Sequence, residues 1–332
     1  MSDLPPSNQA REFDIDLTTR GFSDLAQFVP ESWIKPGEPN LIIVVCYSVF
    51  LSDTASFTTP QLIEFANVRA AIFTSSLRFM SAKIEFDPSV QSGNSLQARI
   101  EGQKTKPKSV HLFLLSPLKE SEKASLRSKG RQDINDIASL LAVCNGRNSA
   151  YEKIFEVILD LNKAQSTSSS SAVVNPLSFA KPDFSMKGVE LVSTLETRID
   201  GLDDKERVRF SLHWFLDAVY EIDHVDSLLK FWIALEAIAM RDSNVRPLVE
   251  ALAKGYQISN DEAKTKFKIG RIQNLRSEIV HTGKLPVFSH ALLDYLQAIY
   301  VDLLFTKTGL SCSKQAEKVL SHLDLDKTLK SI

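Results

Sequence analysis

A serine-rich segment near the middle of the chain separates two halves of different character. The segment spans residues 164–184, AQSTSSSSAVVNPLSFAKPDF, and contains a run of serines, two prolines and almost no charge. Such a composition buries too little apolar surface to offset the entropy that is lost on ordering. We therefore expect a linker or long surface loop over residues 164–185, between a first domain at residues 1–163 and a second at residues 186–332.

The first half alternates between strand-like and helix-like segments. The β-branched run at residues 41–50 predicts a buried strand, and the alternation over residues 13–17 predicts a short edge strand. Thr59 and Pro60 resemble an N-cap and a first-turn proline, so we expect a helix over residues 61–80. Further short strands are expected at residues 82–86, 96–100 and 110–115, and further helices at residues 133–144 and 150–161. This half is therefore predicted to be an α+β domain. Its only histidine, His111, lies inside an apolar strand and is expected to be a core or edge residue rather than a catalyst.

In the second half every sizeable segment has the apolar spacing of a helix. The period is clearest in two sets of residues, which are Val208, Leu212, Phe215, Leu216 and Val219, and then Leu228, Phe231, Trp232, Leu235 and Ala239. Further helices are expected at residues 245–256, 287–305 and 314–323. Ser259 and Glu262 form a capping-box pattern ahead of the next segment. This half is predicted to be an all-α helical bundle.

The segment GRIQNLRSEIVHTG, residues 270–283, combines a helix pattern with two chemically active side chains. Arg276 is followed, after four intervening residues, by His281. An arginine holds a phosphate as a fixed cation, and a histidine moves a proton near neutral pH. Those are two requirements for cleaving a phosphodiester without a metal. The alternative is that both are ordinary surface and capping residues near a helix C-terminus.

The expected helix geometry bears on how this pair could act. Gly283 ends the helix, so His281 falls in its last turn. Five residues turn a helix through roughly 500°, so the two side chains start about 140° apart. A shared target must then lie in a cleft, and a second copy of the motif across a two-fold axis is the simplest way to form one.

The aromatic run FWIALEAIAMR at residues 231–241, together with LRSEIVHTG at residues 275–283, resembles the HEPN family and, within it, the Apea-like branch. The resemblance covers residues 207–304. It implies an all-α, often dimeric domain and a metal-independent endoribonuclease with Arg276 and His281 as catalytic residues. It also implies products with a 2′,3′-cyclic phosphate and a 5′-hydroxyl. Where the family most often has Asn, Asp or His after the arginine, this chain has Ser277, which we expect to be an auxiliary polar contact.

Two further features lie near this motif. Four cations, Lys264, Lys266, Lys268 and Arg271, precede Arg276 and are expected either to line the cleft as an RNA-binding rim or to form a solvated helix face. Glu236 interrupts an apolar helix four residues after Trp232, and a buried carboxylate requires a partner. We expect that partner to be Arg276 or another polar group of the motif helix; the alternative is an exposed edge position.

Composition limits the function classes. A net charge of −2 excludes a strongly basic, RNA-coating protein, so any RNA contact must be local. The three widely spaced cysteines, Cys46, Cys144 and Cys312, predict neither disulfides nor a zinc site, and we expect no metal and no cofactor. The N-terminus has no signal-like pattern, and the longest apolar run is too short to span a bilayer. A cytoplasmic, soluble protein without membrane contact is expected.

Together these features predict a metal-independent endoribonuclease that cleaves RNA at the cleft of a homodimer formed by the second domain. The family resemblance further implies a toxin or anti-phage defence effector, with a sensing or inhibiting role, or a defence-system partner or trigger, for the first domain. The alternative is a non-catalytic module that binds RNA, nucleotide or a partner within a larger defence complex.

Overall fold

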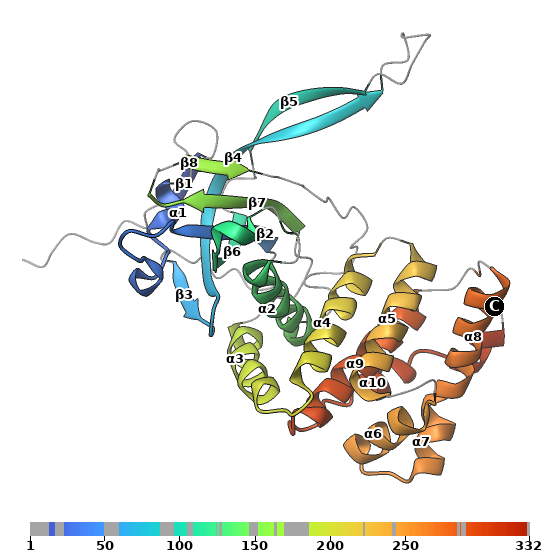
Figure 1. The fold of residues 1–332 in the computed structure, drawn as a ribbon. Helices are drawn as coiled ribbons and strands as arrows, with labels where there is room; N and C mark the ends of the chain where they lie inside the picture. Colours follow the sequence, from blue (N-terminus) through green and yellow to red (C-terminus); the bar gives the residue numbers. More distant parts are fainter. Residues whose placement is uncertain are drawn as a thin grey trace, which may run out of the picture. The chain divides into compact units, whose positions relative to one another are not determined.

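The computed structural model describes residues 13–16, 23–49, 60–86, 96–104, 109–123, 125, 128–145, 152–162, 165–168, 186–221, 223–240, 244–283, 286 and 290–330. The chain divides into two compact units, Met1–Ile134 with Ser149–Phe184, and Asn135–Asn148 with Ser185–Ile332. An α+β N-terminal region followed by an all-helical C-terminal region confirms the predicted fold class (Figure 1). None of the described helices is long and apolar enough to cross a membrane.

The N-terminal unit is built on one sheet. Its strands are β1 (Phe13–Asp16), β2 (Leu41–Val49), β3 (Gln61–Glu64), β4 (Arg69–Phe86), β5 (Leu96–Lys104), β6 (Ser109–Leu118), β7 (Glu152–Asp160) and β8 (Gln165–Ser168). The strand order is β1-β4-β6-β2-β7-β8, and β3 and β5 also pair with β4. The β1–β4 pair is parallel, and the other strand pairs are antiparallel. Short helical segments occur at α1 (Ser23–Ala26), η1 (Glu31–Trp33) and η2 (Glu120–Glu122). The long helix α2 (Lys129–Asn145) begins in this unit, and from Asn135 onward it belongs to the C-terminal unit.

The buried strand β2 organises this sheet. Its sequence, LIIVVCYSV, is almost entirely buried, so its backbone groups need partners on both edges. Strand β6 supplies them on one side and β7 on the other. Phe73 of β4 stacks on Phe113 of β6 with a centroid separation of 5.0 Å, inside the same apolar cluster as the buried free thiol of Cys46. The buried strand predicted at residues 41–50 is confirmed over residues 41–49, and residue 50 lies outside the described residues.

Two helices predicted in this half are wrong. Residues 61–80 form β3 and most of β4, and residues 152–160 form β7, where we expected helices at 61–80 and 150–161. In the first case, residues 70–73 are all buried, so their pattern has neither a helical nor a strand period. These residues form a strand because they pair with β6. In the second, β7 satisfies the free edge of β2, and this tertiary pairing overrides local propensity. Strand β8 falls within the segment expected to be a linker, of which residues 164 and 169–185 lie outside the described residues.

His111 lies in the core of this unit, as its apolar strand predicts. It is fully buried on β6, and its Nδ1 shares a 2.7 Å hydrogen bond with the Oγ of Ser75. Burial lowers the pKa of His111 from 6.5 to about 4. As the pH falls below 6.5, the imidazole of His111 becomes protonated in the unfolded chain, whereas in the folded chain it stays neutral until about pH 4. The stability contribution is therefore complete above pH 6.5 and is lost as the pH falls through that window.

We expect the free energy of unfolding of the N-terminal unit to fall by about 2 kcal/mol between pH 7 and pH 5 through His111 alone. Chemical denaturation at a series of pH values measures this fall. The His111→Asn variant, which has no titrating ring, should lose that part of the pH dependence even if its stability is lower throughout. An identical pH slope in both proteins would contradict the assignment.

The C-terminal unit is a set of packed helices. Its helices are α3 (Met186–Asp200), α4 (Lys205–Tyr220), α5 (His224–Ala239), α6 (Arg246–Tyr256), α7 (Asn260–Phe267), α8 (Ile269–Thr282), α9 (His290–Lys307), α10 (Gln315–Leu320) and α11 (Leu325–Lys330). Helix α5 packs against α4 and α9, and the buried side chains of Phe231, Trp232 and Tyr300 lie in this core. The helices predicted at 245–256, 287–305 and 314–323 correspond to α6, α9 and the shorter α10, and residues 287–289 lie outside the described residues. Ser259 caps α7 by accepting a hydrogen bond from the Glu262 amide, as predicted.

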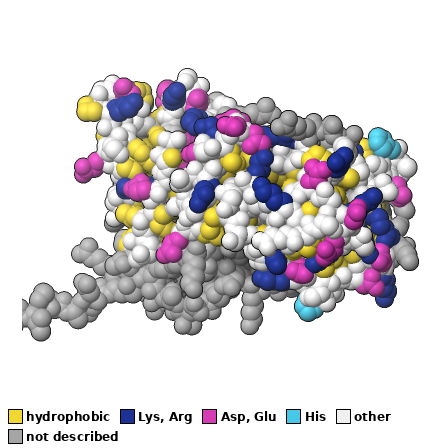
Figure 2. Space-filling view, turned by 90° about the horizontal axis from the view of Figure 1, so that it is seen from below, with side chains coloured by type: hydrophobic (Ala, Val, Ile, Leu, Met, Phe, Trp, Pro, Cys, Tyr) yellow, Lys and Arg dark blue, Asp and Glu magenta, His cyan; other side chains and the backbone are white. Residues whose placement is uncertain are grey.

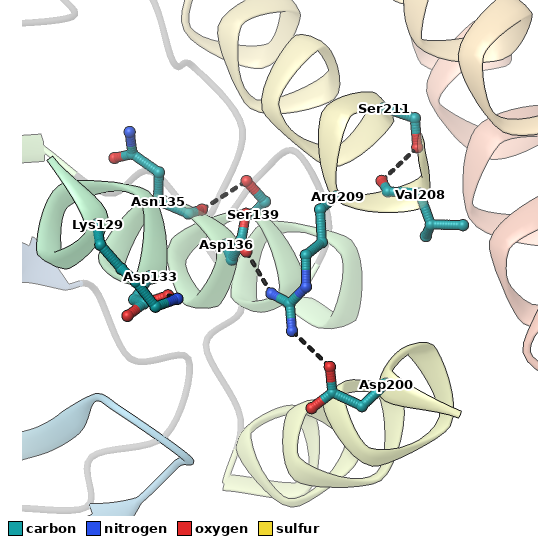
Figure 3. A network of polar contacts seen from close by, with 9 residues as sticks. All are labelled: Lys129, Asp133, Asn135, Asp136, Ser139, Asp200, Val208, Arg209 and Ser211. Atoms are coloured by element: carbon teal, nitrogen blue, oxygen red, sulfur yellow. Dashed lines mark hydrogen bonds and ion pairs between the residues drawn. The ribbon is translucent and has the colours of Figure 1, made fainter. Parts of the chain in front are cut away.

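Polar contacts fix helices of this unit to one another. Arg209 of α4 binds Asp200 of α3 at 2.9 Å and also pairs with Asp136 of α2, so one guanidinium joins three helices (Figure 3). Asp302 of α9 is 1% exposed, and its two carboxylate oxygens accept four hydrogen bonds. The donors are the Tyr256 hydroxyl at 2.5 Å, the Ser313 hydroxyl at 2.9 Å, and the backbone amides of Gln315 at 3.0 Å and Ala316 at 2.9 Å. This carboxylate therefore fixes the start of α10 against α6 and α9.

Candidate functional site

Helix α8 carries the predicted catalytic pair, and its two ends are sharply defined. It begins after Lys268, which has a left-handed backbone (φ 50°) and also ends α7. It ends at Gly283 (φ 68°), whose amide donates to the carbonyl of Ile279 at 3.1 Å. Only glycine adopts this conformation without strain, so the predicted C-terminal stop is confirmed. His281 consequently lies in the last turn of the helix, as predicted.

One stripe of α8 is buried and an adjoining face is open. Ile269, Ile272, Leu275 and Ile279 are all at most 6% exposed and hold the helix against the bundle. We define the α8 open face as the four residues Arg276, Ser277, Val280 and His281. Arg276 and Val280, like Ser277 and His281, are four residues apart and so are neighbours on the helix surface.

The α8 open face presents unpaired polar groups around an apolar centre. Arg276 and Ser277 are half-buried, His281 is exposed, and Val280 is 49% exposed. Within the described part of the chain, the side chains of Arg276, Ser277 and His281 form no hydrogen bond or ion pair. Arginine and histidine are thus available to a ligand, although the helix keeps them about 140° apart in rotation.

Glu236 does not join this face, and its predicted partner is wrong. Its Oε1 accepts a 2.7 Å hydrogen bond from Nε1 of Trp232, one turn earlier in the same helix α5. Trp232 is fully buried, and a buried indole N–H needs an acceptor. The indole of Trp232, and not Arg276 or another polar group of α8, is therefore the partner of the Glu236 carboxylate. Arg207 of α4 donates to the backbone carbonyl of Glu236 at 3.1 Å, so this position links α4 and α5.

The four cations of the predicted RNA-binding rim differ in their surroundings. Lys266 forms an ion pair with Glu317 of α10 at 2.7 Å and also lies 5.7 Å from the ring centroid of Tyr256. Lys268 and Arg271 both pair with one carboxylate, Asp326 of α11. The hydrogen bonds from these lysines lower the pKa of Glu317 and of Asp326.

Lys264 completes the rim. It is exposed, and among the described residues its ammonium has no ion pair. The two acids that neutralise the other rim cations were not predicted from the sequence. Glu317 is 51 residues from Lys266, and Asp326 is 58 and 55 residues from Lys268 and Arg271. No local spacing in the sequence indicates a pairing over such distances. The two charged segments that follow the apolar α9 are the one signal that could have suggested that the chain packs back against the bundle.

A small hollow lies beside α8, away from the open face. Its volume is about 180 Å³, and it is lined by Arg271, Asn274, Leu275 and Glu278 of α8 and by Leu329 of α11. Asn274 and Leu275 follow Arg271 by three and four residues and precede Glu278 by four and three, so the four residues share one side of the helix. Neither Arg276 nor His281 lines the hollow, so the candidate catalytic pair and the rim cation Arg271 face different surroundings.

Charge and composition around these helices do not by themselves mark a nucleic-acid surface. On the face that Figure 2 shows, Lys and Arg side chains are interspersed with Asp and Glu, in keeping with the near-neutral net charge. Among the described residues, no three His, Cys, Asp or Glu side chains lie close enough to hold a metal ion together. Comparison of the chain with models of known protein families, with curated proteins and with solved structures finds no match.

Proposed function

We propose that this protein is a metal-independent endoribonuclease of the HEPN type, with the α8 open face as its catalytic surface. The observation that carries the proposal is the unpaired state of Arg276. Three neighbouring cations, Lys266, Lys268 and Arg271, are engaged by carboxylates, whereas Arg276 is half-buried and forms no ion pair with any residue that the structure describes. A half-buried guanidinium that has no carboxylate partner among the described residues is suited to bind an anionic ligand such as phosphate.

The chemistry follows from these two side chains. The 2′-oxygen of the ribose attacks the adjacent phosphorus, and the bond from phosphorus to the 5′-oxygen breaks. Arg276 binds the non-bridging phosphate oxygens and stabilises the charge that develops on them. One His281 accepts the proton of the 2′-hydroxyl, and a protonated His281 from a second copy donates a proton to the leaving 5′-oxygen. The products are a 2′,3′-cyclic phosphate and a 5′-hydroxyl, and Ser277 contributes an auxiliary hydrogen bond.

A second copy of the chain supplies the other half of this site. The rotation of about 140° between Arg276 and His281 prevents one helix from presenting both to one phosphate. Val280, which lies between them and is 49% exposed, gives the α8 open face an apolar centre that a two-fold contact would bury.

Val280→Asp is expected to weaken dimerisation by roughly tenfold or more, because it places a charge at the centre of the contact. RNA cleavage should fall in proportion to the loss of dimer. Light scattering over a concentration series, together with cleavage rates, measures both quantities. Asn274→Asp, which adds the same charge to another side of α8, is the matched control and should dimerise normally. A wild-type protein that is monomeric and fully active would contradict the dimer.

Incubating the purified protein with total RNA in EDTA tests the proposed activity. Progressive fragmentation in EDTA is the expected result. Stable binding without cleavage would instead favour a non-catalytic RNA-binding module. If the protein neither binds nor cleaves RNA, both the nuclease and the RNA-binding module are contradicted. A nuclease of this type would serve as a toxin or anti-phage effector, with the N-terminal unit sensing a trigger or a defence partner.

A further inference from the structure

We propose that helix α11 is an intramolecular strap that occupies the RNA-binding rim with a carboxylate, Asp326, and that the phosphates of single-stranded RNA displace it. The identity of the displacing ligand rests on the proposed function. The contacts of α11 do not depend on whether RNA is cleaved.

The position of Asp326 carries this inference. Its two carboxylate oxygens pair with two different rim cations, Oδ2 with Lys268 and Oδ1 with Arg271. Lysine and arginine placed around one anion are the groups that bind phosphate oxygens in proteins. The carboxylate therefore lies where a phosphate of an RNA backbone would bind. It occupies two of the four rim cations, Lys268 and Arg271.

The attachment of α11 is slight compared with that of α10. Helix α10 begins at residues whose amides bind the buried Asp302, so Glu317 is carried on a firmly fixed helix. Helix α11 has six residues, of which Leu325 is buried and Leu329 lines the hollow beside α8. The side chain of Asp326 is 49% exposed, and exposed ion pairs contribute little to stability and weaken with salt. A polyanion can therefore compete with α11 more readily than with α10.

Asp326→Asn should consequently tighten RNA binding. The probe is a fluorescently labelled 2′-O-methyl oligouridine, which has no free 2′-hydroxyl and cannot be cleaved by the proposed reaction. Each single-strand phosphate contact steepens the dependence of log K on log salt by roughly 0.7. Freeing Lys268 and Arg271 together should steepen the slope by up to about 1.4 and lower the Kd about tenfold near 0.15 M salt. Glu317→Gln, which frees Lys266 alone, should have the smaller effect of about 0.7.

Two controls separate release of the strap from a general change of charge. Asp261→Asn removes one negative charge from neighbouring α7, where the described residues include no ion partner for it, and should leave the salt slope unchanged. Adding Lys268→Ser and Arg271→Ser to Asp326→Asn should abolish the gain. If Asp326→Asn binds the probe no better than Asp261→Asn does, the strap is excluded.

Hydrogen exchange in the wild-type protein supplies a test that needs no substitution. Saturating probe should speed exchange of the amides of residues 325–330, since RNA takes the place of α11. Unchanged or slower exchange there would overturn the inference. The two proposals can fail separately. Displacement of α11 by the probe without cleavage of ordinary RNA would contradict the nuclease alone, and cleavage without displacement would contradict the strap alone.

Discussion

Arg276→Ala and His281→Ala are each expected to lower the rate of RNA cleavage at saturating substrate by at least about a hundredfold. Removing a general acid or base typically costs about 10²- to 10⁴-fold, and removing a group that stabilises the developing charge costs a similar factor. Neither side chain has a partner among the described residues, so the melting curves should be almost unchanged. Cleavage rates in EDTA and thermal melts of the same preparations measure the two effects.

Two further variants sharpen this test. Arg276→Lys keeps the charge but loses the planar fork that binds two phosphate oxygens, so it should recover only a small part of the rate. His213→Ala removes an exposed histidine of α4 and should cleave RNA at the wild-type rate. If Arg276→Ala or His281→Ala kept wild-type cleavage with an unchanged melt, the catalytic surface would lie elsewhere.

Asp302→Asn is expected to destabilise the C-terminal unit by about 3–5 kcal/mol. Each oxygen of this buried carboxylate accepts two hydrogen bonds, Oδ1 from Ser313 and Gln315, and Oδ2 from Tyr256 and Ala316. An amide group replaces one oxygen with a donor, so two buried donors lose their acceptor, at about 1–3 kcal/mol each, and meet a competing N–H. Chemical denaturation followed by tryptophan fluorescence measures the loss, because Trp214 and Trp232 both lie in this unit.

Tyr256→Phe is the matched variant for this network. It removes one donor and leaves the carboxylate with three, so the expected cost is smaller, about 1–2 kcal/mol. The double variant should cost less than the two single variants together, since the hydroxyl and the carboxylate bind each other. Additive costs, or an Asp302→Asn protein as stable as wild type, would show that the four hydrogen bonds do not hold α10 in place.

The helical half of the fold was predictable because its signals are local. The apolar period of α5, the cap at Ser259 and the stop at Gly283 each depend on residues within one or two turns. In the N-terminal half the decisive interactions are strand pairings between distant segments. The pairing of β2 with β7 joins residues more than a hundred positions apart, and no pattern within residues 152–160 distinguishes that strand from a buried helix.

The same distinction applies to the candidate site. The placement of Arg276, Val280 and His281 on α8 follows from helical spacing, and the structure places them as predicted. The partner of Glu236 was wrong because its nearest donor is the indole of Trp232 within its own helix. The neutralised state of Lys268 and Arg271 depends on how the last helix packs, which the spacing of charges in the sequence does not determine.

Cleavage of two matched oligonucleotides in EDTA tests the nuclease proposal most directly. One is an ordinary single-stranded RNA, and the other has the same bases with a deoxyribose at every position. The proposed reaction requires an attacking 2′-hydroxyl and no metal. Wild-type protein should therefore cut the RNA, leave 2′,3′-cyclic phosphate ends and spare the DNA, and His281→Ala should cut neither. RNA that stays intact with wild-type protein, or equal cleavage of the RNA and the DNA oligonucleotides, would contradict the proposed nuclease.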